Sequence, residues 1–241
     1  MNNFWHLNVN DAASRLGTDA VHGLAKTEAE ARLKTYGPNQ LAEKKGQGPL
    51  AIFFEQFNDF IIWILIGAAL VSGFLKEWVD ALAIIVIVIV NAILGFIQEY
   101  RAEKSLAALK KLSSPNSKVI RDGTRMVVPS VALVPGDVVE LEAGDNVPAD
   151  SRVVWVTSNF SVHEASLTGE STPVMKTVSA LEEKEIALAD RANMLYMGTS
   201  VVYGKGLALV VLTGMQTEFG KIANMIDAER GLIILGKRIL N

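Results

Sequence analysis

Two charge-free apolar runs, separated by only five residues, constrain the fold of this chain most strongly. The runs cover residues 60–75 and 81–97. With its flanks, each run reaches about the 17–20 residues that a helix needs to cross a bilayer, whereas a buried strand would be far shorter. The first run also begins too far from the N-terminus to be a signal peptide. Because the linker 76–80 is so short, the helices must turn straight back, and the sequence predicts a transmembrane hairpin.

Most basic residues near this hairpin lie before its first helix or after its second helix. In the connecting loop, Lys76 is the only basic residue. Basic residues near a span favour the cytoplasmic side. We therefore expect a multi-pass protein of the cell (plasma) membrane, with both termini cytoplasmic, residues 76–80 outside and the lipid membrane as a partner. The flanking basic residues are Lys44 and Lys45 before the first run, and Arg101, Lys104, Lys110 and Lys111 after the second.

The composition excludes several classes of function. The chain has no Cys, which rules out disulfides, thiol nucleophiles and thiolate metal sites. Its three histidines, His6, His22 and His163, include no pair at helical spacing, so we predict no metal site. The formal net charge of −3 gives no basic footprint for nucleic acid, which we do not expect as a partner.

The residues before the hairpin favour helices. Asn10 or Asp11 is a candidate N-cap for a first helix. Thr27 followed by Glu30 has the spacing of a capping box for a second helix. Gly37-Pro38 is a typical end for that second helix.

After the hairpin, the second helix is expected to continue as a stalk, and from Lys118 the apolar period becomes two. Asp122-Gly123 marks a hairpin turn. Gly and Pro then punctuate short strands, which predicts a mainly β, distorted jelly-roll-like domain with flanking helices. Thr217 is a candidate cap for the last helix. The other expected turns contain Pro135-Gly136-Asp137, Gly144-Asp145 and Gly204-Lys205-Gly206.

The sequence therefore predicts a multidomain membrane protein, which combines an α-helical transmembrane hairpin with a mainly-β cytosolic domain. Five parts are expected along the chain. They are a helical cytosolic N-terminal segment at 1–56, the transmembrane hairpin at 57–98, a helical stalk at 99–115, the β-rich domain at 116–228 and a truncated C-terminal tail at 229–241.

The polar stretch EASLTGES, at residues 164–171, is not needed to pack a core. It holds two carboxylates, three hydroxyls and one glycine. Taken alone, Thr168, Gly169, Glu170 and Ser171 are equally consistent with a polar β-turn, because Gly and Ser favour turns for conformational reasons. The interpretation of these four residues therefore depends on the rest of the chain.

Five sequence motifs, spread over nearly the whole length, resemble the N-terminal part of a type II P-type cation-transporting ATPase, the group that includes the calcium pumps. Five matches in the same order are far more specific than any one of them. By this resemblance the β-rich domain is similar to that family's actuator domain. The motifs are GLAKTEAEARLKTYGPNQL (23–41), NAILGFIQEYRAEKSLAALKKL (91–112), VPGDVVELEAGDNVPADSRVV (134–154), EASLTGESTPV (164–174) and GTSVVYGKGLALVVLTGMQTEFGKIA (198–223).

The resemblance implies a catalytic role for the polar stretch. In the family, ATP phosphorylates an Asp on another domain, and the actuator later brings its Thr-Gly-Glu-Ser loop onto the aspartyl phosphate. Glu170 would then position and deprotonate the attacking water. Gly169 would let the backbone approach the phosphate, and Thr168 and Ser171 would hydrogen-bond the loop or the phosphoryl oxygens. ATP and Mg would bind the complete pump, and no cofactor is expected in this chain.

Two motifs of phosphate chemistry are missing from the sequence. They are the Asp-Lys-Thr-Gly segment that carries the family's phosphorylated Asp, and a P-loop of the form Gly-x-x-x-x-Gly-Lys-Ser/Thr. We therefore expect no ATPase activity from this chain alone, and expect it to be a truncated product, a fragment or one piece of a split pump. Its partners would be the phosphorylation and nucleotide-binding domains and the remaining transmembrane helices.

Two other interpretations stay open. A membrane-anchored interaction or regulatory module derived from such a pump would keep the motifs without catalysis. An unrelated anchored β-domain that binds a ligand would have no reason to carry them in this order. A neighbouring coding sequence with the Asp-Lys-Thr-Gly segment would favour a split or interrupted pump over the regulatory module.

Several other polar residues have simpler interpretations. Asn91, within the second run, favours an interhelical hydrogen bond over an ion ligand. His163 stands where the family often has Asp and is interpreted as a strand-end surface residue. Asp150 is expected to stabilise a strand end. Glu55 and Asp59 precede the first run, where solvation at the membrane surface is favoured over a role in ion entry.

Overall fold

The structure is a computed structural model whose described residues fall into two compact units. The apolar unit holds the described residues between 43 and 113. The β-unit combines the residues before and after it. Side chains are not described at 103 and 106–112. The structure describes residues 3–41, 48–58, 60–112, 115–169, 171–183 and 185–225.

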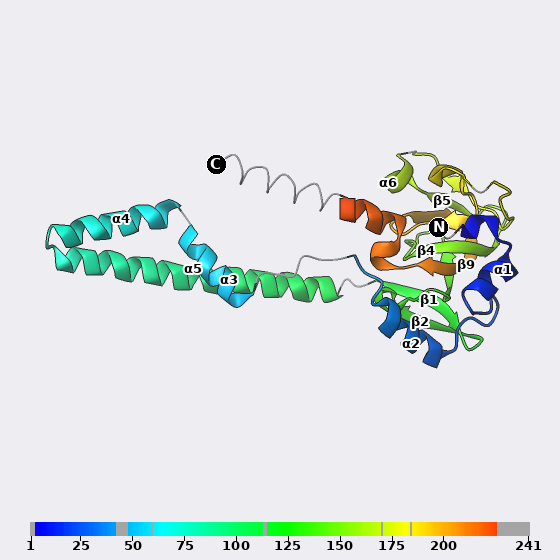
Figure 1. Ribbon diagram of the computed structural model, residues 1–241, viewed down its shortest axis with the longest axis horizontal. Helices are drawn as coiled ribbons and strands as arrows, with labels where there is room; N and C mark the ends of the chain where they lie inside the picture. Colours follow the sequence, from blue (N-terminus) through cyan, green and yellow to red (C-terminus); the bar gives the residue numbers. More distant parts are fainter. Residues whose placement is uncertain are drawn as a thin grey trace. The chain divides into compact units, whose positions relative to one another are not determined.

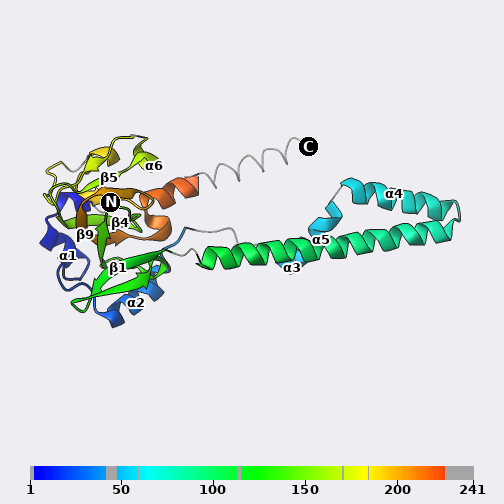
Figure 2. The same ribbon diagram turned by 180° about the vertical axis from the view of Figure 1, so that it is seen from behind.

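The apolar unit is helical. Helices α4 and α5 run side by side, joined by a short turn (Figures 1 and 2). Helix α5 is one continuous element from the apolar run into the charged segment beyond it, as predicted. Residues 78–102 of α5 are long and apolar enough to cross a membrane, and the segments 49–58 and 60–74 pass the same test only as a bent pair. The elements are α3 (Pro49–Glu55), the 3-10 turn η2 (Gln56–Asn58), α4 (Phe60–Phe74) and α5 (Trp78–Leu112).

The β-unit contains two antiparallel sheets, which confirms the predicted β-rich domain. The first sheet has the strand order β2-β1-β3-β9-β4-β7, and the second has the order β6-β5-β8. Buried Val, Leu, Ala and Phe side chains of both sheets form one core. The strands are β1 (Asn116–Arg121), β2 (Thr124–Pro129), β3 (Val138–Glu142), β4 (Asp150–Val156), β5 (Ser161–His163), β6 (Val174–Met175), β7 (Met194–Leu195), β8 (Ser200–Tyr203) and β9 (Lys205–Leu212).

Two glycine turns show how the sequence specifies this arrangement. Asp122 and Gly123 have φ angles of 50° and 68°, as a tight hairpin turn between β1 and β2 requires, so that prediction is confirmed. Gly204, at φ 80°, joins β8 to β9, but these strands belong to different sheets. A Cβ on Gly204 would lie 2.8 Å from the Cα of Phe160. The chain crosses between the sheets here because Gly204 permits this close approach.

The N-terminal helices pack on the β-unit, and their caps differ from the predicted ones. Helix α1 (Val9–Arg15) begins after Asn8, whose Oδ1 accepts a hydrogen bond from the backbone N–H of Asp11 at 2.9 Å. The predicted caps Asn10 and Asp11 therefore lie inside the helix. Helix α2 (Lys26–Tyr36) has no side-chain cap, so the capping box predicted from Thr27 and Glu30 is wrong. The predicted end of α2 is confirmed, because Gly37 follows it with a φ of 77°.

A tertiary contact replaces the missing cap of α2. The Asp122 carboxylate, in the β1–β2 turn, accepts a hydrogen bond from the backbone N–H of Lys26 at 3.1 Å. This donor is one of the first N–H groups of the helix, which have no partner within the helix itself. The carboxylate that satisfies it lies 96 residues away in the sequence, which is why local spacing could not reveal it.

The guanidinium of Arg152 joins the N-terminal residues to the first sheet. Arg152 is fully buried and donates hydrogen bonds to the carbonyl oxygens of Phe4 at 3.2 Å and Leu7 at 3.0 Å. The buried amide of Asn193 donates another to the carbonyl oxygen of Trp5 at 2.8 Å. Phe4 and Trp5 are themselves buried in a core shared with the sheet. Residues 3–41 are therefore part of the β-unit's folded structure.

Asn39 fixes the end of this N-terminal segment. Its buried side chain accepts a hydrogen bond from the N–H of Gly214 at 2.8 Å. The same side chain donates to the carbonyl oxygens of Ser130 at 3.0 Å and Pro148 at 2.9 Å. One amide thus joins the segment to three separate parts of the β-unit.

Replacing this amide should destabilise the β-unit. We expect Asn39→Ala to lower its free energy of unfolding by about 1–3 kcal/mol, because buried polar groups lose their partners. Hydrogen exchange of the β9 amides in the full chain measures this. The control Gln40→Ala removes an exposed neighbouring side chain and should change the value by less than about 0.5 kcal/mol. Equal effects of the two substitutions would show that the Asn39 bonds contribute nothing.

Candidate functional site

The polar stretch singled out in the sequence forms the loop of a hairpin in the second sheet. Strand β5 ends at His163, β6 begins at Val174, and the two strands pair antiparallel with Val162 opposite Val174. Between them, a single helical turn, α6 (Ala165–Thr168), lies beside β5 in Figure 1. His163 is the last residue of β5, which agrees with its interpretation as a strand-end residue.

The turn α6 depends on the backbone of Glu164. The carbonyl oxygen of Glu164 accepts hydrogen bonds from the N–H groups of Leu167 at 2.9 Å and Thr168 at 3.0 Å. It also accepts one from the Thr168 hydroxyl at 3.1 Å. On the other side of the turn, the Ser166 hydroxyl donates to the carbonyl oxygen of Gly198 at 3.1 Å. These bonds set the direction in which the chain enters the predicted catalytic residues.

Gly169 ends α6 in the left-handed conformation. Its φ and ψ angles are 77° and −4°, a region that favours glycine. A Cβ at this position would meet no atom of the described chain within 4 Å. The local requirement for Gly169 is therefore conformational, because nothing in this unit crowds it.

The structure brings three of the four predicted site residues together in one segment. Thr168 is half-buried at the end of α6, and Gly169 and Ser171 are exposed. Glu170, the predicted general base, lies outside the described residues. We call this segment the 168–171 loop.

A buried ion pair beneath the loop was not found by the sequence reasoning. The Lys176 ammonium lies 2.6 Å from the Glu164 carboxylate, and both side chains are 0% exposed. Burial raises the pKa of Glu164 and lowers the pKa of Lys176, while their mutual attraction opposes both shifts. The signal available in the sequence was a pair of opposite charges, with Glu164 directly after β5 and Lys176 directly after β6.

A second buried carboxylate, Asp150, joins three parts of the β-unit at the start of β4. Its two oxygens accept hydrogen bonds from the N–H groups of Met197 at 2.9 Å and Glu218 at 2.7 Å. Glu218 begins the helix over residues 218–225, whose predicted cap is confirmed, since the Thr217 hydroxyl accepts from the N–H of Gly220 at 3.0 Å. Burial raises the pKa of Asp150 to about 6, although the two N–H groups act in the opposite direction. Asp150 therefore lies at the end of a strand, as predicted, and also binds the first N–H group of a helix.

This raised pKa gives a pH-dependent prediction. Between about pH 4 and 6 the folded state keeps the Asp150 proton, whereas the unfolded chain loses it. The contribution of the protonated Asp150 to the free energy of unfolding is therefore complete below about pH 4 and is lost as the pH rises through about 6. Relative to Asp150→Asn, the wild-type chain should lose up to about 3 kcal/mol of stability over that range. Hydrogen exchange of β4 and β9 amides in both chains measures the difference. A difference that is constant with pH, or that grows in favour of the wild type, would contradict the prediction.

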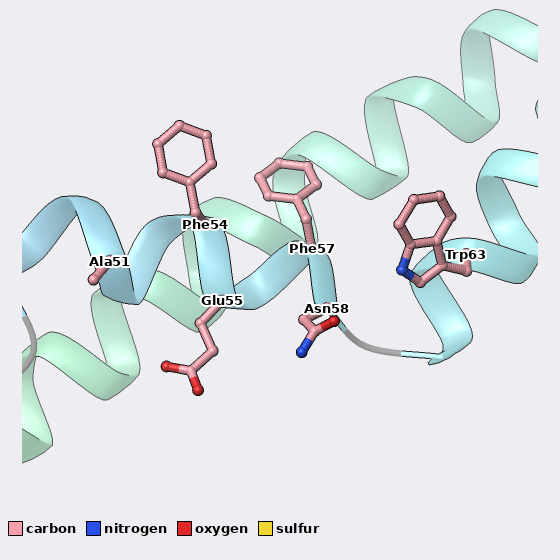
Figure 3. Close-up of a pocket in the computed structure, with 6 residues that line it drawn as sticks. All are labelled: Ala51, Phe54, Glu55, Phe57, Asn58 and Trp63. Atoms are coloured by element: carbon pink, nitrogen blue, oxygen red, sulfur yellow. The ribbon is translucent and has the colours of Figure 1, made fainter. Parts of the chain in front are cut away.

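Glu55, one of the polar candidates of the apolar unit, lines a shallow hollow. Figure 3 shows the rings of Phe54 and Phe57 on one side of the α3–η2 segment and the side chains of Glu55 and Asn58 on the other. Asp59 lies outside the described residues. Asn91 is exposed on α5, so its predicted interhelical hydrogen bond stays a prediction. The hollow is lined by Ala51, Phe54, Glu55, Phe57, Asn58 and Trp63.

Within the described ranges, no group of three or more His, Asp or Glu side chains is placed to hold a metal ion. The loop that follows α6 is exposed and polar at Gly169 and Ser171. Two hydroxyls and a left-handed glycine flank the position of a carboxylate there.

Comparisons with known families match both parts of the chain. Residues 4–72 match the N-terminus of the cation transporter/ATPase family. Residues 111–227 match the P-type ATPase actuator domain. The chain belongs to the P-type cation-transporting ATPases. The mainly-β part of the chain, within residues 111–227, is the actuator domain of this family.

Individual P-type ATPases align over most of the chain. A calcium-transporting ATPase of Bacillus subtilis is 46% identical over 225 residues, which is 93% of this chain and 25% of that protein. A probable cation-transporting ATPase F of Mycobacterium tuberculosis is 46% identical over 88% of this chain and 23% of its own length. Calcium-transporting ATPase 1 of Yarrowia lipolytica is 41% identical over 93% of this chain and 24% of its own length. The chain thus spans about a quarter of the length of these relatives.

Proposed function

We propose that this chain supplies the loop that dephosphorylates the aspartyl phosphate of an ATP-driven cation pump. The match of residues 111–227 to the actuator domain carries the proposal. The geometry of the loop supports it. Gly169 and Ser171 are exposed at the end of a hairpin, where a second domain can reach them, and the left-handed Gly169 directly precedes Glu170.

In the proposed reaction, the Glu170 carboxylate takes a proton from a water molecule, and the water oxygen attacks phosphorus. The bond from phosphorus to the aspartyl oxygen breaks, which releases inorganic phosphate and the free aspartate. An acyl phosphate is already activated, so the loop has only to orient the water and remove its proton. ATP and Mg serve the earlier phosphorylation, on domains outside this chain.

The two hydroxyl residues have different roles in this proposal. The Thr168 hydroxyl donates to the Glu164 carbonyl oxygen and so stabilises the turn before the base. Ser171 is exposed on the other side of Glu170, where its hydroxyl can donate to a phosphoryl oxygen. Thr168 therefore acts on the loop, and Ser171 on the bound phosphate.

We further propose that residues 57–98 form a transmembrane hairpin. Large apolar side chains are exposed along both α4 and α5, among them Trp63, Leu70, Phe74 and Ile85. Soluble monomers rarely expose continuous apolar surface of this extent. The basic residues that flank the hairpin favour cytoplasmic termini, and residues 99–115 then form the stalk that leads to the actuator domain.

Cysteine labelling tests this topology. The chain has no Cys, so a single introduced thiol is unique. In intact cells, a reagent that cannot cross membranes should label Glu77→Cys, in the loop between α4 and α5. It should label Ser158→Cys, an exposed position of the actuator domain, only after the cells are opened. The reverse pattern would show that the orientation is wrong.

The Glu170→Gln substitution tests the catalytic role. We define the chimaeric pump as the Bacillus subtilis calcium-transporting ATPase in which this chain replaces the aligned segment. Gln keeps the size of Glu but removes its charge and most of its basicity, and losing a general base typically costs about 10²–10⁴-fold in rate. After an ATP chase, the phosphoenzyme of the variant should still form and then decay more slowly by that factor.

Ser171→Ala is the matched control within the same loop. It removes one hydrogen bond, worth about 0.5–1.5 kcal/mol, and should slow the decay by only about threefold to tenfold. Wild-type decay in the Glu170→Gln pump would instead support a polar turn without catalysis, as in a regulatory module.

A further inference from the structure

The buried contact between Glu164 and Lys176 lies at the base of the 168–171 loop. The two residues stand on either side of the loop in the sequence, and their charged groups are 2.6 Å apart. In the described part of the chain, neither charged group has a hydrogen-bonding partner beyond this contact. The position of each charge is therefore set by the other.

Lys176 reaches this contact from the far end of the hairpin. Its backbone N–H donates to the carbonyl oxygen of Phe160 at 3.0 Å, so Lys176 lies opposite a residue four positions before Glu164. The Lys176 side chain must therefore extend along the hairpin toward the loop. It also passes the ring of the buried Tyr196, whose centroid lies 6.0 Å from the ammonium nitrogen. The ion pair thus ties the loop end of β5 to the opposite end of β6.

Glu164 is the residue on which the start of the loop depends. Its carbonyl oxygen accepts three hydrogen bonds from Leu167 and Thr168, while its carboxylate contacts Lys176. A rotation of the Glu164 backbone would move its carbonyl oxygen and so displace all three hydrogen bonds together. Holding its side chain therefore holds α6 and, through α6, the left-handed Gly169.

A buried ion pair is weak evidence of a contribution to stability. Two charges lose their hydration on burial, and replacing a buried ion pair by apolar residues of similar volume is often neutral or stabilising. What an ion pair adds is a defined direction and distance between its two groups. Its presence beneath the loop is explained if orientation matters there more than stability.

We propose that Glu164 and Lys176 are positioning residues, which hold the 168–171 loop in the orientation needed for attack of water on the aspartyl phosphate. This inference rests on the proposed function of Glu170. Neither residue touches the reacting atoms. Both act through the turn α6, and the ion pair confines that turn to one arrangement.

The first test is phosphoenzyme decay in the chimaeric pump. Glu164→Gln and Lys176→Met should each leave phosphorylation by ATP intact and slow the decay by up to about 10²-fold, the cost of misplacing a catalytic group by about 1 Å. The control Lys118→Met removes a partner of the exposed Lys118–Glu142 pair in the same domain and should decay as the wild type does. Normal decay in Glu164→Gln, beside slow decay in Glu170→Gln, would overturn the positioning role alone. Normal decay in Glu170→Gln would overturn the proposed function itself.

The second test separates orientation from stability and uses the chain as it stands. In the double variant Glu164→Leu, Lys176→Met, the core amides of β4 and β9 should exchange hydrogen at the wild-type rate. The amides of Leu167, Thr168 and Gly169 should exchange at least about tenfold faster, because local opening is independent of global unfolding. The same double variant in the chimaeric pump should still show slow decay. Wild-type loop exchange and wild-type decay would show that an apolar contact serves equally well and would refute the proposal.

Discussion

The buried guanidinium of Arg152 is the contact on which the organisation of the chain depends. It lies on β4 and donates to the backbone of residues 4 and 7, almost 150 positions earlier. Because leaving donors of a buried guanidinium without acceptors is costly, these two hydrogen bonds favour the N-terminal residues staying on the sheet. Burial lowers the pKa of Arg152 to about 10, well above physiological pH, so the group keeps its charge. The parts of the chain before and after the apolar unit are thereby one folded unit.

This arrangement makes the helical hairpin an insertion within the β-unit. Asn39 fixes the chain just before it leaves for the apolar unit, and β1 fixes it just after it returns. Asp150 fixes the helix over residues 218–225 in the same way. All three points of the chain are therefore held by contacts within the same β-unit.

The sequence was sufficient where the signal is local or periodic. Apolar length predicted α4 and α5, alternation predicted the strands, and Asp122-Gly123 predicted its hairpin. The sequence failed where a distant residue supplies the partner. The cap of α2 comes from Asp122, the backbone of Phe4 and Leu7 is held by Arg152, and the Glu164 carboxylate is paired across the hairpin by Lys176. No spacing rule connects such residues, because their contacts form only once the sheets have assembled. Of the site residues, Thr168, Gly169 and Ser171 lie together on one loop, and the role of Glu170 rests on the family.

The proposed function requires above all that the 168–171 loop meets the phosphorylated aspartate of another domain. Cross-linking in a chimaeric pump whose other cysteines have been replaced tests this directly, since Thr172 is exposed beside the loop and this chain adds no Cys of its own. The measurement is the disulfide yield, in the chimaeric pump, between Thr172→Cys and a Cys placed next to the phosphorylated Asp. We expect the yield to rise when ATP phosphorylates the pump. A yield that is the same with and without ATP, or no cross-link under either condition, would contradict it.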